Sequence, residues 1–592
     1  MTVSSTLEGG LWPPSFIPAG QSPRPTLSLP ALLGLVLLVS GPLVPNHQLP
    51  WATFYADALA IAGIGFLTLT WLGRRSTDRW PLAAVAALVL AAVPLAQAGG
   101  RVIFFWGDAW LACAYLCLLG FAIKCGYELT SDATKAETLI VSLAWLVLGS
   151  ALVSASLALV QWLRLDLLGI FLADLPVGGR PYANFGQPNS LATWLMMGLA
   201  SLVLLFEARR LGSATLLIAG VALTAGVAMT QSRTAWIEAA VLLIWFFFAR
   251  RRVAFRLSPW WALAFAALLA LLVGGWPAIC DLLHLSAGRT LSEQTEDIRP
   301  ELWRAMLDAI GRQPLLGYGW NQASVAQSAV AATREPIGGI IEHSHNLPVD
   351  LLVWNGVPLG LLLIGLIAWW LVHKARSVQD FFGALILVAV GMVLTHAMFE
   401  FPLDYAYFLL PVGLMVGVLE RSAPLGRAVR ISGPIAAGLA AVLAALVIWI
   451  AHDYREVQAN TLQWRFESAR IGPPPAKPSV APDVALLTQQ REFLRFARTQ
   501  ARRGMSADEL TWMRQVAARF GYPPTLFRYA LATALNDDPA SSAEALARLC
   551  ALHPPARCKE GLEAWTAMAA GPYPELRAVQ FPALIRVGMR ER

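Results

Sequence analysis

Long apolar stretches alternate with short polar turns through the first three quarters of the chain. A helix of about 20 apolar residues spans the hydrocarbon layer of a membrane. A β-barrel would show weaker, alternating segments, so we expect helices. The pattern predicts an all-α, polytopic integral membrane protein with about thirteen transmembrane helices, at residues 27–45, 57–73, 80–97, 109–124, 137–163, 189–208, 213–229, 235–249, 258–276, 347–371, 381–399, 405–420 and 431–451.

The composition agrees with this fold class. Of the 592 residues, 57% are hydrophobic and only 14% are charged. An ordinary soluble protein carries roughly a quarter of charged residues. The chain is therefore not expected to be a soluble enzyme.

Two polar regions interrupt or follow the apolar segments. We expect a short N-terminal segment at 1–26, a transmembrane catalytic domain at 27–451 and a helical C-terminal domain at 452–592. Within the second of these, residues 277–346 form one large polar loop.

Local signals predict some structure in the polar regions. Residues 300–310 have the pattern of an amphipathic helix, and Ser506 and Ser541 resemble helix caps because an acidic residue follows each three positions later. The predicted topology places Cys550 and Cys558 in an oxidising compartment, where a disulfide between them is plausible. The alternative is a pair of free thiols.

Lysine and arginine gather in alternate turns between the predicted spans. One set of turns contains Arg74 and Arg75, Arg209 and Arg210, and the cluster at 250–256, whereas the opposite turns hold few basic residues. The positive-inside rule then places the N-terminus in the cytoplasm and the C-terminal domain outside. Residues 1–26 lack the pattern of a cleavable signal peptide. The net charge of +7 reflects this topology and gives no support for nucleic-acid binding.

The segment Glu342-His343-Ser344-His345-Asn346 stands where the large polar loop re-enters an apolar helix. The chain has only eight histidines, and two of them lie here, one residue apart. Ionisable groups at a membrane boundary usually have a functional reason to be there. The segment therefore indicates proton chemistry at the interface between water and lipid.

Other common catalytic signatures are missing from the sequence. It contains no HExxH, no glycine-rich phosphate loop, no paired CxxC and no Asp-x-Asp. A metal-dependent hydrolase, an ATPase and a metal-dependent glycosyltransferase are therefore less favoured. Outward-facing arginines remain as candidates to bind an anion such as a lipid-linked diphosphate, because guanidinium matches phosphate oxygens: Arg180, Arg233, Arg299 and Arg304.

Several motifs together resemble a known family. They are residues 180–189, 231–234, Trp303 through residues 317–320, 342–346 and 400–405. In order and content they resemble the bacterial O-linked oligosaccharyltransferases, which glycosylate pilins and other exported proteins and belong to the O-antigen ligase and polymerase superfamily. The resemblance covers roughly residues 27–420.

One spacing within the resemblance is informative. His345-Asn346 is followed after nine residues by Gly356, which is the spacing associated with the histidine of the ligases. Three positions after that glycine the family often has a small or polar residue, whereas this chain has Leu359.

The resemblance implies a GT-C-like membrane fold and a reaction. A preassembled glycan would be moved from undecaprenyl diphosphate to a serine or threonine of an exported protein such as pilin. The reaction would take place at the periplasmic face of the bacterial inner membrane, without a metal or another cofactor. The implied partners are the lipid-linked donor, the acceptor protein and the bilayer.

Roles for single residues follow from this reaction. A hydroxyl is a weak nucleophile at neutral pH, and a histidine has a pKa in the range of a useful general base, so His345 is the candidate base. Departure of the diphosphate builds negative charge that Arg180, Arg233 and Arg299 could stabilise. Glu342 and His343 are expected to support the base. Substrate-binding roles are predicted for Arg299, Arg304, Gln187, Asn189, Asn346, Glu400 and Tyr405.

Each assignment has a structural alternative. His345 could cap the tenth span, and His343 could be a packing residue. Arg233 could be an ordinary interfacial arginine whose charge reaches toward water. Arg299 and Arg304 could be plain surface charges.

The remaining polar candidates are equally open. Gln187 and Asn189 could only cap the sixth span. Glu400 could orient a histidine, pair with an arginine, or be an interfacial carboxylate at a helix end.

Two other functions compete with protein glycosylation. An O-antigen ligase acting on a lipopolysaccharide core sugar, or a polymerase, would use the same donor and hence the same residues. A transporter of lipid-linked glycans would show polar residues buried along its spans, and the sequence shows few. The long C-terminal region favours a protein acceptor, as the resemblance implies.

Overall fold

The computed structural model describes residues 27–72, 78–285, 298–333, 336–472 and 479–580. These residues are mainly helical, and the chain divides into two compact units. The first unit comprises 1–90, 114–296 and 366–445; the second comprises 91–113, 297–365 and 446–592. The predicted N-terminal segment, 1–26, lies outside the described residues.

Each predicted span falls on an α-helix. The helices are α1 (Leu29–Ser40), α2 (Phe54–Leu69), α3 (Leu82–Leu90) with α4 (Ala92–Gly99), α5 (Trp106–Leu129), α6 (Ala133–Trp162), α7 (Pro188–Glu207), α8 (Ser213–Met229), α9 (Arg233–Ala249), α10 (Pro259–Leu282), α13 (Leu347–Ser377), α14 (Phe381–His396), α15 (Ala406–Ser422) and α16 (Gly433–Ser468).

Not all of these helices are long enough to cross a membrane by themselves. Among the described residues, seven helical segments have the length and composition required: 82–99, α5, α6, α7, α10, α13 and α16. Shorter apolar helices include α2, α8 and α14. The multi-pass membrane fold is therefore supported, whereas the count of thirteen spans stays a prediction.

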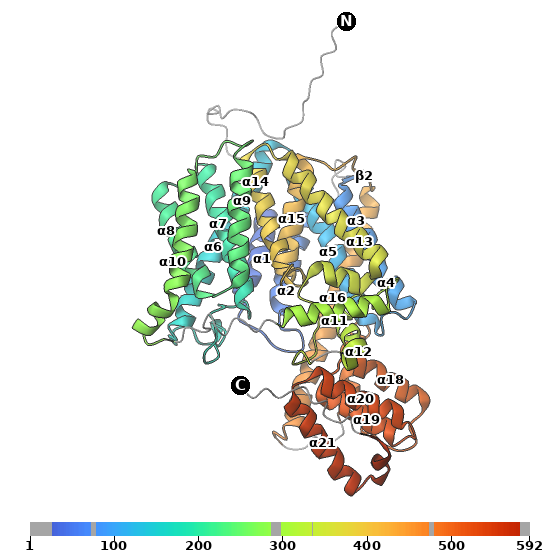
Figure 1. The fold of residues 1–592 in the computed structure, drawn as a ribbon. Helices are drawn as coiled ribbons and strands as arrows, with labels where there is room; N and C mark the ends of the chain where they lie inside the picture. The colour runs from blue at the N-terminus through green and yellow to red at the C-terminus, as the bar shows by residue number, and fades with distance from the viewer. Residues whose placement is uncertain (1–26, 73–77, 286–297, 334–335, 473–478, 581–592) are drawn as a thin grey trace. The chain divides into compact units, whose positions relative to one another are not determined.

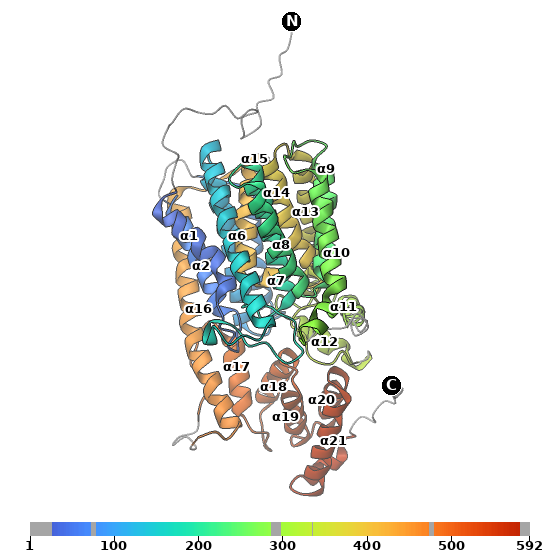
Figure 2. The same cartoon turned by 90° about the vertical axis from the view of Figure 1, so that its left-hand side faces the viewer.

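Helix α7 lies at the centre of the first unit. It packs against α6, α8, α9 and α14, which lie beside it in Figures 1 and 2. Nearly all of its side chains are buried, including the polar Asn189 and Thr193. Polar groups buried in such a helix need hydrogen-bond partners from its neighbours.

Turns of the first unit that carry many basic residues contact one another. Strand β1 (Arg79–Trp80) pairs antiparallel with β2 (Val429–Arg430). Arg210 forms an ion pair of 2.7 Å with Glu137. These turns were all predicted on the same side of the membrane, so their grouping agrees with the predicted alternation of the spans. Which side is cytoplasmic stays a prediction.

The second unit contains residues 298–333 and 336–346 of the predicted large loop together with the C-terminal helices. The loop contributes α11 (Arg299–Arg312) and α12 (Ala323–Val330). The C-terminal region contributes α17 (Thr488–Arg498), α18 (Ala507–Arg519), α19 (Pro523–Ala534), α20 (Pro539–Leu552) and α21 (Pro555–Ala570).

The C-terminal helices share one hydrophobic core with other parts of the second unit. Met513, Val516 and Leu546 are fully buried in it, together with Phe105 from the segment between α4 and α5 and Ala331 from the end of α12. The region 452–592 thus packs as part of a larger unit. Helix α16 runs without a break through residue 452, where the sequence predicted a domain boundary.

Most local predictions for the polar regions are confirmed. Helix α11 covers the predicted amphipathic segment and buries Leu302 and Met306. Ser506 and Glu509 form a capping box at the start of α18. Cys550 and Cys558 form a disulfide.

Two local predictions are wrong. Pro277, where the large loop was expected to begin, lies inside α10, which continues to Leu282 because the sequence stays largely apolar there. Ser541 is not the cap of α20. The cap is Asp538, whose side chain accepts a hydrogen bond of 3.0 Å from the Ser541 amide. Pro539 follows at the first helical position, which proline favours.

Candidate active site

The candidate base stands in a loop that we call the histidine loop, residues 342–346. His345 has a left-handed backbone with φ of 56°, and its side chain is half-buried. A residue other than glycine in this conformation carries a strain that the surrounding structure must hold, and such strain clusters at functional sites. The conformation is consistent with a side chain placed for a purpose.

Asn346, rather than His345, caps the following helix. Its side-chain oxygen accepts a hydrogen bond of 3.1 Å from the Val349 amide, and its carbonyl accepts one of 2.9 Å from Asp350. This is the geometry of a helix N-cap. Capping therefore accounts for Asn346, and a substrate-binding role for it stays a prediction.

A buried carboxylate lies beneath the histidine loop. Asp350, in the first turn of α13, accepts a hydrogen bond of 2.8 Å from the Ser344 amide, and it lies 3.9 Å from Nδ1 of His343. His343 is buried, and its ring meets the edge of Trp354. These contacts bury His343 against α13, and a supporting role for it stays a prediction. Asp350 was missed from the sequence, although an acidic residue in the first turn of an apolar helix is a visible signal.

Two glycines allow the loop after α11 to lie directly against α13. Gly317 and Gly356 both have positive φ, and a Cβ added to either would come within 2.4 Å of a carbonyl oxygen of the other segment. Across this contact the Tyr318 amide donates to the Val353 carbonyl at 2.7 Å. The glycine after His345-Asn346 therefore has a structural reason: it lets a neighbouring backbone support the start of the helix that follows the histidine loop.

Glu342 lies close to an ion pair that fixes the C-terminal helices. Arg519 of α18 is buried and makes two hydrogen bonds of 3.1 Å with the carboxylate of Asp108. Burial alone would lower the pKa of the Arg519 guanidinium, but Asp108 raises it, and Glu342 acts in the same direction. Burial raises the pKa of the Tyr522 hydroxyl, and Glu342 again adds to the increase. Glu342 thus acts electrostatically on the C-terminal helices.

The two arginines of α11 differ in their surroundings. Arg299 is the first residue of the helix and is half-buried. Arg304 is exposed and pairs with Glu301 on the same helix. The position of Arg304 fits a solvated surface charge better than a phosphate ligand.

In the first unit the structure brings Arg180 to the turn that contains Arg233. We call residues 230–233 the arginine turn. The Arg180 guanidinium donates to the Gln231 carbonyl at 3.1 Å, and Arg233 is the first, exposed residue of α9. One guanidinium group thus belongs to a turn at a helix N-terminus and a second contacts the same turn, an arrangement suited to an anion.

A buried hydrogen-bond chain supports the arginine turn. Ser232 caps α9 and donates to Oδ1 of Asn189 at 2.8 Å, while the Asn189 amide donates to Oε1 of Glu400 at 3.0 Å. Glu400 is buried, so it is not merely an interfacial carboxylate at the surface. The structure therefore brings two predicted site residues, Asn189 and Glu400, into direct contact and connects them to the cap of α9.

Gln187 and Tyr405 have local partners. Gln187 precedes α7 without capping it; its side-chain oxygen accepts a hydrogen bond of 2.9 Å from Ser190. The ring of Tyr405 is stacked on that of Tyr407, with centroids 5.3 Å apart.

A buried polar group in the first unit was not predicted from the sequence. Thr193 of α7, Glu238 of α9 and His396 of α14 are all fully buried. The Thr193 hydroxyl lies 2.5 Å from Oε1 of Glu238 and 3.0 Å from Nδ1 of His396. The spans therefore bury more polar side chains than the sequence led us to expect. Ionisable residues inside apolar helices were the signal that could have revealed this group.

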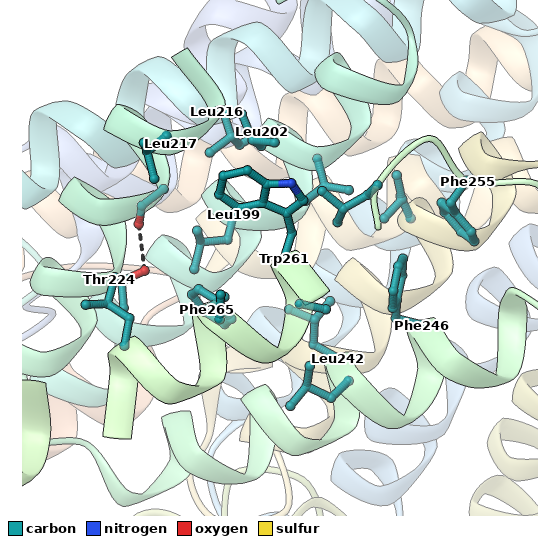
Figure 3. A pocket seen from close by; sticks show the side chains of 18 of the residues that line it. Leu199, Leu202, Leu216, Leu217, Thr224, Leu242, Phe246, Phe255, Trp261 and Phe265 are labelled. Atoms are coloured by element: carbon teal, nitrogen blue, oxygen red, sulfur yellow. Dashed lines mark hydrogen bonds between the residues drawn. The ribbon is translucent and has the colours of Figure 1, made fainter. Parts of the chain in front are cut away.

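A separate apolar cavity of about 160 Å³ lies within the first unit, among α7, α8, α9, α10 and α14. Figure 3 shows Trp261 and Phe265 beside Leu199 and Leu242 in its lining. Its lining contains no charged side chain, and the hydroxyl of Thr224 bonds to the Gly220 carbonyl of its own helix. The cavity can therefore hold apolar groups but offers no catalytic chemistry.

Within the described residues, no group of three His, Cys, Asp or Glu side chains is placed to hold a metal ion. Metal independence of the reaction stays a prediction.

Comparison with known families identifies matches along most of the chain. Residues 181–206 match the family described as "Protein glycosylation ligase", and residues 218–364 match "O-Antigen ligase". Residues 384–566 match "Virulence factor membrane-bound polymerase, C-terminal". The match to "O-Antigen ligase" contains both Arg233 and His345.

Two curated relatives come from Acinetobacter baylyi. A general O-oligosaccharyltransferase is 31% identical over 451 residues, which are 73% of this chain and 77% of the relative. A ComP-specific O-oligosaccharyltransferase is 27% identical over 397 residues, or 65% of this chain and 70% of the relative. The chain therefore belongs to the bacterial O-oligosaccharyltransferases, membrane glycosyltransferases related to the O-antigen ligases.

Proposed function

We propose that the protein transfers a preassembled glycan from undecaprenyl diphosphate to a serine or threonine hydroxyl of an exported protein such as pilin. The reaction is proposed to occur at the periplasmic face of the inner membrane. The observation that carries the proposal is the occurrence of His345 and Arg233 in supported polar turns within the part of the chain that matches the ligases.

His345 acts as the general base in this proposal. It takes the proton of the acceptor hydroxyl while the hydroxyl oxygen forms a bond to the anomeric carbon of the glycan. The bond from that carbon to the diphosphate oxygen breaks, and the lipid diphosphate leaves with the electron pair. His343 and Asp350 support the loop that carries the base.

Arg180 and Arg233 stabilise the departing diphosphate. Arg233 belongs to the arginine turn and Arg180 contacts it, and the buried Glu400 and Asn189 hold the turn through the Ser232 side chain. Fixed donors of this kind stabilise developing charge without having to reorganise during the reaction. Arg299 is a further candidate for this role, whereas Arg304 is not required.

A second candidate function is the transfer of the same glycan to a lipopolysaccharide core. The match to O-antigen ligases over residues 218–364 favours it. The two functions share a donor and differ in the acceptor.

One comparison separates them. Exported proteins are analysed by mass spectrometry, and lipopolysaccharide by gel, from bacteria with the wild-type chain, without it, and with the His345→Ala variant. Loss of glycosylated peptides with an unchanged lipopolysaccharide ladder supports the protein ligase. The opposite pattern selects the lipopolysaccharide ligase and refutes the proposed acceptor.

A further inference from the structure

A pocket in the second unit is lined by both charged and aromatic side chains. It has a volume of about 460 Å³ and lies between the segment preceding α5 and the helices α17 and α18. We call it the aromatic pocket and define it by Phe104, Trp106, Arg491, Glu492, Arg495 and Trp512.

Both arginines of the aromatic pocket are paired with the same carboxylate. Glu492 is buried and accepts hydrogen bonds from Arg491 at 2.8 Å and from Arg495 at 3.3 Å. The nearby Glu509 pairs with Arg502. A pocket whose arginines are already paired with carboxylates is poorly suited to a diphosphate, because the anion would have to displace them. The aromatic pocket is therefore not a second site for the lipid diphosphate.

Aromatic surfaces face the same space. Trp106 is 46% exposed although it belongs to a structured helix start. The Arg495 guanidinium lies 4.3 Å from the ring centroid of Trp512, which extends the flat surface. Grooves that combine aromatic rings with hydrogen-bonding side chains are used to bind extended peptides, since the rings receive proline or apolar side chains while the polar groups meet the peptide backbone.

The location of the aromatic pocket favours an acceptor over a donor. Its walls come from residues 104–106 and 488–515, outside the segment 218–364 that matches O-antigen ligases. Residues 488–515 lie instead within the match to "Virulence factor membrane-bound polymerase, C-terminal". A lipid-linked glycan donor is proposed to be common to both kinds of enzyme, so its ligands are expected in the shared segment. The acceptor is what distinguishes them.

The wall of the pocket is also connected to the loop that leads to His345. The Phe104 amide donates to the side chain of Gln322 at 3.1 Å, and Gln327 of the same α12 region accepts from the Ile341 amide at 3.0 Å. The pocket and the histidine loop are thus parts of one hydrogen-bonded unit. A chain bound in the pocket would be held at a fixed position relative to the candidate base.

We propose that the aromatic pocket binds an extended segment of the acceptor polypeptide, away from the residue that is glycosylated. This inference rests on the proposed protein acceptor. It assigns to the pocket the task of selecting the acceptor, while His345 and the arginine turn carry out the transfer.

The test compares a long and a short acceptor with purified full-length chain. The long acceptor is a synthetic peptide of about 20 residues, which extends to at most about 70 Å, taken from a glycosylated protein found by mass spectrometry. The short acceptor is a tripeptide centred on the same serine or threonine. Trp106→Ala and Arg495→Gln should each raise KM for the long peptide by about tenfold, without changing KM for the tripeptide or for the lipid-linked donor.

Phe466→Ala is the matched control, because Phe466 is 46% exposed in the same unit, lies beyond the predicted span 431–451 and does not line the pocket. The control should leave every KM unchanged. An increase in KM for the donor alone would mean that the pocket binds the glycan, and would overturn the proposal. Unchanged values in both pocket variants, or equal losses with both acceptors, would overturn it as well.

Direct binding distinguishes failure of this inference from failure of the proposed function. Calorimetric titration of the long peptide into the full-length chain requires no turnover. Binding that is weakened by Trp106→Ala would support the pocket even if no transfer occurred. Binding unaffected by the substitution would refute the pocket whether or not transfer occurred.

Discussion

The arginine turn and the histidine loop are two polar centres built in different ways. The arginine turn depends on residues far apart in the sequence, Asn189, Ser232 and Glu400, which meet through buried hydrogen bonds within the first unit. The histidine loop is contiguous, since His343, Ser344 and Asp350 lie within one short segment. Both centres combine a basic side chain that is not fully buried, Arg233 or His345, with a buried carboxylate, Glu400 or Asp350.

This difference determines which substitutions would remove the structural support of each centre. The arginine turn is held by the packing of helices, so its support is lost when a buried partner is removed. The histidine loop is held by its own backbone and by two glycine contacts, while the ion pair of Arg519 with Asp108 fixes the helices beside Glu342.

The largest expected effect breaks the histidine loop at its chemistry. His345→Ala removes the proposed base and should lower kcat by about 100- to 10,000-fold. Turnover of purified variant at saturating donor and acceptor measures this effect. The amount of folded protein should match wild type, since His345 is only half-buried; a turnover within a few-fold of wild type would remove His345 from its role.

Breaking the ion pair of the second unit should mainly lower stability. Arg519→Met leaves Asp108 buried and unpaired, which costs about 3 to 5 kcal/mol in the free energy of unfolding. Thermal unfolding of the purified chain measures the loss. The double variant Asp108→Leu with Arg519→Met should be more stable than Arg519→Met alone, because no unpaired charge remains. A double variant as unstable as the sum of both single changes would contradict this account of the pair.

Breaking the support of the arginine turn should have a smaller effect on stability. Asn189→Leu removes hydrogen bonds to Ser232 and Glu400 and should cost about 2 to 3 kcal/mol. The same thermal measurement applies, with donor KM recorded beside it. We expect donor KM to rise and acceptor KM to stay constant; the reverse would mean that the turn serves the acceptor.

Replacing the guanidinium of the arginine turn tests its geometry without removing the charge. Arg233→Lys should raise donor KM or lower kcat by about tenfold, because an ammonium cannot reproduce the two-pronged hydrogen bonding of guanidinium. Arg304→Lys is the matched control, since Arg304 is an exposed, ion-paired arginine. A wild-type donor profile for Arg233→Lys would return Arg233 to the role of an interfacial anchor.

The smallest expected effect concerns the buried histidine. His343→Gln keeps a hydrogen-bonding side chain near Asp350 and should reduce kcat only a few-fold. Parallel turnover assays with His345→Ala give the comparison. A loss as large as that of His345→Ala would exchange the roles of the two histidines.

The sequence predicted the contiguous features well. The apolar pattern located the helices, and local spacing indicated the histidine loop, the amphipathic helix α11 and the capping box at Ser506. For Cys550 and Cys558 the sequence left a disulfide and free thiols open, and the structure has the disulfide. Such features depend on residues close together in the sequence, so they can be recognised without knowing the tertiary packing.

The features that the sequence did not predict depend on tertiary packing. Asn189 and Glu400 were candidates, but their contact is formed only when α7 packs near the segment that follows α14. Thr193, Glu238 and His396 come from three different helices, and each looks isolated in the sequence. Arg519 likewise reads as an ordinary C-terminal charge until Asp108 is placed beside it.

Mass spectrometry of an acceptor peptide tests the central claim most directly. The peptide, which contains one serine or threonine, is incubated with purified chain and an oligosaccharide linked to undecaprenyl diphosphate. We predict that its mass increases by one complete glycan on that hydroxyl, and that the increase disappears with His345→Ala but persists with Arg304→Lys. An unmodified peptide, from a preparation that attaches the same glycan to a lipopolysaccharide core, would contradict the account.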